Sequence, residues 1–97
     1  MAFRPLKEGS DTATSGKGAI VAKAESKVLA EANQGRVALE IVNDGATKVW
    51  IAYGKTAVAE EGIPLYPEGG SKVIENYSGP VSVITKSGES RVGFIEV

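Results

Sequence analysis

The chain has 97 residues, which is enough for one domain with a modest hydrophobic core. It contains no cysteine and no histidine, which excludes disulfide bonds, thiolate metal sites and the commonest general base. The formal net charge is −1, from 11 basic and 12 acidic side chains, without the basic excess of a nucleic-acid-binding protein. The composition therefore favours a small protein that works through its surface rather than by catalysis.

Residues 1–18 form a polar segment rich in glycine, serine and threonine, which predicts an extended N-terminal arm. The segment has no apolar run of signal-peptide or membrane-spanning length, so we expect a chain that is made in the cytoplasm and carries no anchor. Residues 1–27 carry five basic and three acidic side chains, and such a region could dock on an acidic protein surface. Ordinary solvated charge is the simpler explanation of the same pattern.

Residues 19–97 contain short alternating or β-branched stretches that are separated by turn residues, and no convincing long helix. This pattern predicts an all-β body, a single small antiparallel β-sandwich or jelly-roll-like barrel of about six to eight strands. A partly open barrel is the alternative. The expected strands are 19–24, 27–32, 36–42, 48–53, 63–66, 72–76, 81–86 and 91–97.

Three details of these strands are specific enough to test. The stretch 27–32 could equally form a helical turn, because its residues favour helices. Pro64 cannot donate a hydrogen bond to a neighbouring strand, so 63–66 is expected at a sheet edge. The alternation places Val37, Leu39 and Ile41 on one face of their strand. It places Val49, Ile51 and Tyr53 on the inner face of the next.

Two hairpins are expected. The turn Asn43-Asp44-Gly45 is made of residues that tolerate positive φ, and it predicts a hairpin between 36–42 and 48–53. The residues Ser87, Gly88 and Glu89 predict a second hairpin between 81–86 and 91–97.

Two motifs resemble binding or catalytic sites, but neither has the geometry that such a site needs. The stretch Thr14–Ala19 looks like a phosphate-binding loop, yet it lacks the Walker spacing and no strand precedes it, so part of a flexible arm is the better interpretation. Glu60 and Glu61 are adjacent carboxylates, but neighbours in an extended segment point in opposite directions, and a solvated loop is expected. We therefore expect no enzyme, no catalytic residue, no cofactor and no metal site.

Trp50 is a candidate contact residue. It lies opposite Val49 and Ile51 in the alternation, so it is predicted to point outward and to be at least half exposed. Exposed tryptophans are enriched in protein interfaces and sugar-binding surfaces. The alternative is that the strand is central, or that the arm covers the indole.

The last strand is a second candidate. Val92 and Phe94 are predicted on one face, and Ile95 and Val97 on the other. A strand that is apolar on both faces has to be covered on both, by the arm or by a neighbouring subunit.

The chain from Arg36 onward resembles small β-sandwich proteins that tailed bacteriophages encode among their virion structural genes. A strand ending in asparagine and a small turn, then a strand ending in glycine, is matched by Val42-Asn43-Asp44-Gly45 and Tyr53-Gly54. The next segment of the family pattern reads Gly-Ile-x-Leu-x-Pro-Gly. It is matched by Gly62, Ile63, Leu65, Pro67 and Gly69, with Glu68 inserted between the last two. The aromatic, glycine and valine or isoleucine that follow in the pattern are matched by Tyr77, Gly79 and Val81.

The resemblance implies a virion component, and members of the family serve as capsid decoration (cement) proteins or as head- or tail-fibre domains. Together with the arm, Trp50 and the last strand, it leads us to expect a decoration protein that binds the major capsid protein on the outside of the assembled head, as a trimer or other cyclic homo-oligomer. The arm lies outside the shared pattern, and its role as a clamp between neighbouring capsid subunits is a separate hypothesis. No nucleic-acid or membrane partner is expected. The expected interface residues are Phe3, Arg4, Pro5, Leu6, Lys7, Trp50, Phe94, Ile95 and Val97. The alternatives are a head- or tail-fibre component, with Trp50 in a receptor- or glycan-binding surface, and a generic soluble β domain.

Overall fold

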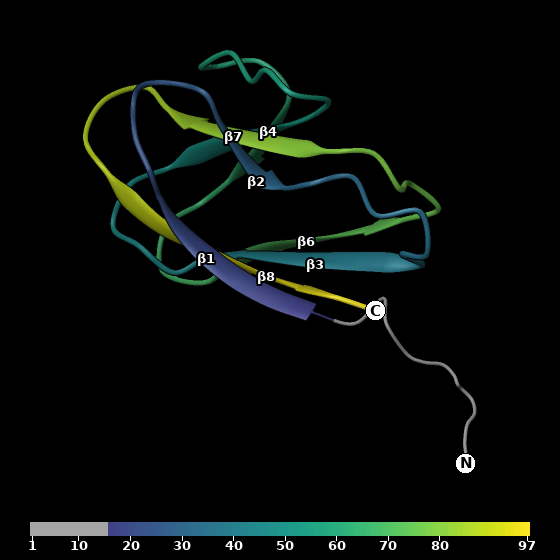
Figure 1. Ribbon diagram of the computed structural model, residues 1–97. Helices are drawn as coiled ribbons and strands as arrows, with labels where there is room; N and C mark the ends of the chain where they lie inside the picture. Colours follow the sequence, from purple (N-terminus) through teal and green to yellow (C-terminus); the bar gives the residue numbers. More distant parts are fainter. Residues whose placement is uncertain (1–15) are drawn as a thin grey trace.

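The computed structural model describes residues 16–97, which form eight β-strands in two facing four-stranded sheets (Figure 1). All strand pairs are antiparallel, so the expected all-β sandwich is confirmed. The residues after Ser26 form a strand rather than a helical turn. The strands are β1 (Gly16–Ala22), β2 (Lys27–Ala30), β3 (Ala38–Asn43), β4 (Val49–Tyr53), β5 (Ile63–Leu65), β6 (Gly70–Glu75), β7 (Val81–Thr85) and β8 (Ser90–Glu96).

The strand order is that of an eight-stranded jelly roll. One sheet has the order β1-β8-β3-β6 and the other β2-β7-β4-β5. Within residues 16–97, only β4 and β5 are consecutive strands of the same sheet, and every other connection crosses from one sheet to the other. Such crossing connections build the double Greek key of a jelly roll.

Both expected hairpins are wrong. β3 pairs with β6 and β8, whereas β4 pairs with β5 and β7 in the opposite sheet. β7 and β8 are likewise in different sheets. The turn residues therefore form corners between the two layers.

The side chain of Asn43 explains the first of these corners. Its Nδ2 donates to Thr47 O at 2.8 Å and to Leu65 O at 3.0 Å, and its Oδ1 accepts the Ser90 hydroxyl at 2.6 Å. Asn43 is fully buried, so these bonds replace the water that its amide would otherwise need. A Cβ added to Gly45 would collide with Ser90, so the chain can turn closely past β8 only because residue 45 is glycine.

The core lies between the sheets and is built from alternate residues. Leu39, Ile41, Val49 and Ile51 are fully buried, as the alternation predicts. Tyr53 is 54% exposed, so its expected inward position is wrong, and Val37 is 65% exposed. Both lie at strand ends: Val37 precedes β3, and the ring of Tyr53, the last residue of β4, stacks on Tyr77 with centroids 4.7 Å apart.

A buried arginine holds one end of the sandwich together. The Arg36 side chain is fully buried, and its Nε donates to Glu96 Oε1 at 2.9 Å. Its Nη1 donates to the carbonyls of Tyr77 and Gly79, and its Nη2 to the carbonyl of Glu31 at 2.6 Å. One planar guanidinium thus joins the end of β8 to the loops that precede β3 and β7.

Two edges of the sandwich bear on the sequence predictions. Pro64 lies in β5, which among residues 16–97 pairs only with β4, so its expected edge position is confirmed. β1 begins at Gly16, three residues before the expected start of the body, and pairs along its whole length with β8. Residues 16–19 of the phosphate-loop candidate therefore form part of an extended strand.

Candidate functional site

The outer face of the sheet β1-β8-β3-β6, which points away from the second sheet, gathers exposed apolar and charged side chains. Val92 of β8 is buried in the core, so Arg91, Gly93 and Ile95 point outward. The pairing register aligns these three with outward residues of the neighbouring strands. The aligned rows, from β1 to β6, are Lys17, Ile95, Glu40 and Val73, then Ala19, Gly93, Val42 and Ser71, then Val21, Arg91 and Asp44.

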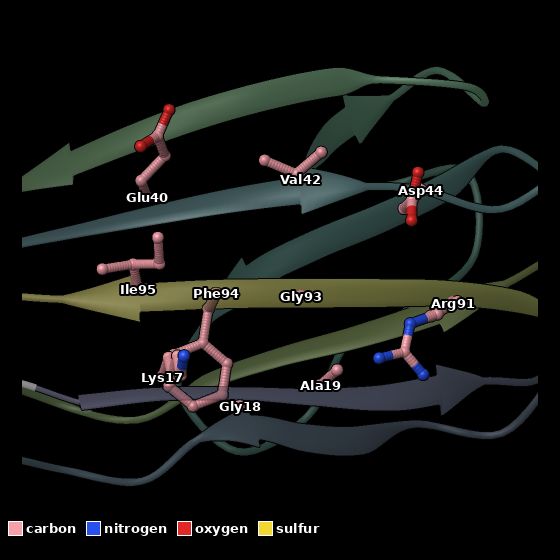
Figure 2. Close-up of a pocket in the computed structure, with 10 residues that line it drawn as sticks. All are labelled: Lys17, Gly18, Ala19, Glu40, Val42, Asp44, Arg91, Gly93, Phe94 and Ile95. Carbon is pink, nitrogen blue, oxygen red and sulfur yellow. The ribbon is translucent and has the colours of Figure 1, made fainter.

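The centre of this face is hollowed at Gly93. Gly93 has no side chain, and its neighbours across the strands, Ala19 and Val42, are small (Figure 2). The resulting depression has a volume of about 570 Å³ and is open to solvent. A Cβ added to Gly93 would meet only ordinary contacts, at 3.6 Å from Gly18 O and 4.0 Å from Ala19 Cβ. The hollow can therefore accept side chains from another surface.

Opposite charges flank the hollow. Glu40 and Asp44 lie on the β3 side, whereas Lys17 lies on β1 and the guanidinium of Arg91 extends from β8 toward β1 (Figure 2). Within residues 16–97, none of these four side chains forms an ion pair. The face thus presents an acidic and a basic side that are free to meet a partner.

Exposed aliphatic side chains lie among these charges. Ile95 is 53% exposed, Val73 50% and Val21 41%, and Val97 just beyond β8 is 55% exposed. Exposed aliphatic groups that gather on one face of a small domain indicate an interaction surface. The interface role of Ile95 and Val97 stays a prediction, and the structure places both on the surface.

Phe94 lies on the other side of β8. It is half-buried, packs against the hydrophobic core and places its ring under Gly18, where an added Cβ would lie 2.8 Å from the ring. Most of the Phe94 ring therefore packs toward the core, as the alternation along β8 predicts, although Phe94 also lines the edge of the hollow beside Gly18 (Figure 2).

Trp50 is on the outside of the other sheet, but the expectation that it is at least half exposed is wrong. Only 9% of its surface is exposed, although it lies opposite the core residues Val49 and Ile51. β4 is a central strand, with Pro64 and Ile84 beside the indole on either side. The Lys48 ammonium lies 5.0 Å from the centre of the indole ring and 4.7 Å from that of Tyr66.

The loop between β4 and β5 lies on the outer side of the sheet β2-β7-β4-β5 (Figure 1). Ala57 of the loop is buried and donates its N–H to Ser26 Oγ at 2.8 Å, and Glu60 forms a 2.8 Å ion pair with Lys86. The Lys86 ammonium lowers the pKa of Glu60 through a hydrogen bond and its charge, and Glu60 raises the pKa of Lys86. Both groups are exposed, so their ion pair contributes little to stability but places the loop.

The remaining expected interface residues, Phe3, Arg4, Pro5, Leu6 and Lys7, lie outside the described residues. Among residues 16–97, no helix is long and apolar enough to cross a membrane. The same residues contain no cluster of three or more acidic side chains placed to hold a metal ion. Neither the models of known protein families nor the curated protein sequences yield a match to the chain.

Sequence reasoning missed most of the outer face. Ile95 is among the interface residues predicted from the sequence, whereas Lys17, Glu40 and Val73 are not. Alternation within each strand nevertheless predicts on which side of the strand each of these residues lies. What the sequence does not contain is the order β1-β8-β3-β6, which brings these strands side by side.

Proposed function

We propose that the chain is a structural protein of a bacteriophage virion, a capsid decoration protein that binds the outside of the assembled head. The resemblance of residues 36–97 to small phage β-sandwich proteins supports this assignment. The jelly-roll fold is compatible with it, although such folds serve many functions.

The outer face of β1-β8-β3-β6 is the observation that carries the proposal. Ile95, Val73 and Val21 remain 41–53% exposed there, beside charges that have no partner in the described chain. A surface of this kind suits a protein whose work is contact with other subunits. Binding that occurs only on the assembled shell stabilises that shell by linkage, and many copies multiply a weak contact.

The arm contributes to the same function in this proposal. Residues 1–15 precede β1, and their apolar and basic side chains, from Phe3 to Lys7, would contact neighbouring capsid subunits. Trp50, the candidate stacking residue of a glycan-binding surface, is 9% exposed and offers little surface to a sugar, which argues against a glycan-binding role.

Co-sedimentation with undecorated heads of the encoding phage tests the proposal. The full chain is expected to sediment with assembled heads, and to leave free capsid protein unbound. Val73 and Val58 form a matched pair, because both are valines with 50% exposure and only Val73 lies on the outer face. Val73→Glu should weaken head binding and Val58→Glu should not. A wild-type chain that stays in the supernatant at saturating concentrations of heads would refute the proposal.

A further inference from the structure

The charges of the outer face are arranged symmetrically about β8. Lys17 of β1 and Glu40 of β3 are both aligned with Ile95, so each is displaced by one strand from β8, about 4.8 Å to either side. Two rows further along, Asp44 lies on the β3 side and the Arg91 guanidinium on the β1 side (Figure 2). Lys17 thus has an acidic counterpart at the mirror position across β8, and the Arg91 side chain, which starts from β8 itself, leans to the side opposite Asp44 (Figure 2).

This pattern is complementary to itself. When two copies are stacked face to face about a twofold axis parallel to β8, β1 of each copy lies over β3 of the other. Lys17 then faces Glu40 of the second copy, and Arg91 faces Asp44 of the second copy. An axis perpendicular to the strands would instead oppose Glu40 and Asp44, which repel. The charge pattern selects the first arrangement.

We propose that the outer face binds a second copy of this chain through this twofold arrangement. The proposal rests on the proposed function in taking this face as a contact surface, and it names the partner. Gly93 lies on the axis, where the two β8 strands approach most closely, and its hollow removes the bulk that would keep the sheets apart. The exposed Ile95 of each copy meets its symmetry mate beside the hollow.

The area of this contact is too small for a stable dimer. Three overlapping strands, about 4.8 Å apart and each contributing about six residues at about 3.3 Å, cover roughly 300 Å² per copy. Twice this area is well below the ~1,200 Å² at which stable interfaces begin. The dimer is therefore weak in dilute solution, and it forms when many copies are held together on a surface. β6 lies outside the overlap, so Val73 stays accessible for a different partner.

Charge reversal tests the pairing without any capsid. Sedimentation velocity at millimolar concentration and low salt should show a reversible dimer of the full wild-type chain. Lys17→Glu and Glu40→Lys should each weaken it at least about tenfold, because two exposed pairs per dimer become repulsive. The double variant Lys17→Glu/Glu40→Lys restores both pairs at the wild-type net charge and should dimerise again.

An equimolar mixture of the two single variants should also dimerise, because each then faces the opposite charge. Lys55→Glu and Glu61→Lys change the same charges in the exposed loop between β4 and β5, and should leave self-association unchanged. Circular dichroism confirms that each variant is folded. A wild-type chain that remains monomeric, or a dimer that both single reversals leave intact, overturns the proposal. Head binding without dimerisation would refute only this inference, and dimerisation without head binding only the proposed function.

Discussion

Replacing Arg36 with methionine removes a side chain that joins three separated segments at the end of the sandwich. The guanidinium donates to Glu96 Oε1 and to the carbonyls of Glu31, Tyr77 and Gly79. Methionine fills similar space but donates nothing, so the Glu96 carboxylate, whose side chain is 16% exposed, loses its ionic partner. The three carbonyls lose a buried donor at the same time.

The magnitude follows from these losses. Removing one member of a buried ion pair costs about 3–5 kcal/mol, because the remaining charge is uncompensated. A domain of this size has a free energy of unfolding of about 5–15 kcal/mol. Arg36→Met should therefore remove roughly a fifth or more of the free energy of unfolding. Arg36→Lys keeps the charge but cannot reach four acceptors from one planar group, and about 2 kcal/mol should be lost.

Urea unfolding measures the effect, and Trp50 is a convenient probe because it is the only tryptophan and is buried. Arg91→Met is the control, since Arg91 is exposed and its removal should change the free energy of unfolding by less than about 0.5 kcal/mol. In the double variant Arg36→Met/Glu96→Met no unpaired carboxylate remains, so the combined loss should fall short of the sum by about 1 kcal/mol or more. A loss below about 1 kcal/mol for Arg36→Met would refute the argument.

Three further predictions concern other parts of the sandwich. Ser82 Oγ is buried without a hydrogen-bond partner among the described residues, so Ser82→Ala should leave the unfolding midpoint unchanged or raise stability by up to about 1 kcal/mol, and a clear loss would reveal a missing partner. Gly45→Ala should lower the free energy of unfolding by about 1–3 kcal/mol, because the added methyl group would collide with Ser90. Gly93→Ala should leave it nearly unchanged, and equal effects of the two variants in urea unfolding would contradict the close approach of Gly45 to Ser90. The fluorescence of Trp50 should be quenched only weakly by acrylamide, and strong quenching would contradict its burial.

The strands could be predicted from the sequence because each carries its own local pattern. Alternation located β3 and β4 and the inner positions of Leu39 and Ile41, and Pro64 placed β5 at an edge. These predictions depend on the backbone geometry of a single strand and on the burial of one of its two faces. Both can be recognised from a few consecutive residues.

The sheet partners could not be predicted in the same way. Asn43, Asp44 and Gly45 tolerate the backbone angles of a hairpin turn, but the same residues can form a corner between sheets. The hydrogen bonds of Asn43 to Leu65 and of Ser90 to Asn43 join it to residues far along the chain, and no local pattern contains them. The pairing of β3 with β8 and of β4 with β7 is therefore a property of the whole core.

In the candidate site, too, some properties could be predicted from the local sequence and others could not. Alternation predicts that Ile95 and Phe94 lie on opposite faces of the last strand, whereas for Trp50 it predicts an exposed side chain, and Trp50 is only 9% exposed, in a central strand. The side of a strand on which a side chain lies is set by the strand itself. The exposure of that side chain depends also on which other segments of the chain pack against it. The complementarity of Lys17 and Glu40 became visible only when the register aligned both with Ile95.

An electron cryomicroscopy reconstruction of heads saturated with the chain tests the central claim most directly. The proposed function and the twofold pairing together predict density for the jelly roll on the outer surface, in pairs whose β1-β8-β3-β6 faces meet across a twofold axis. Heads without such density, or bound copies whose outer face is open to solvent, would contradict the account.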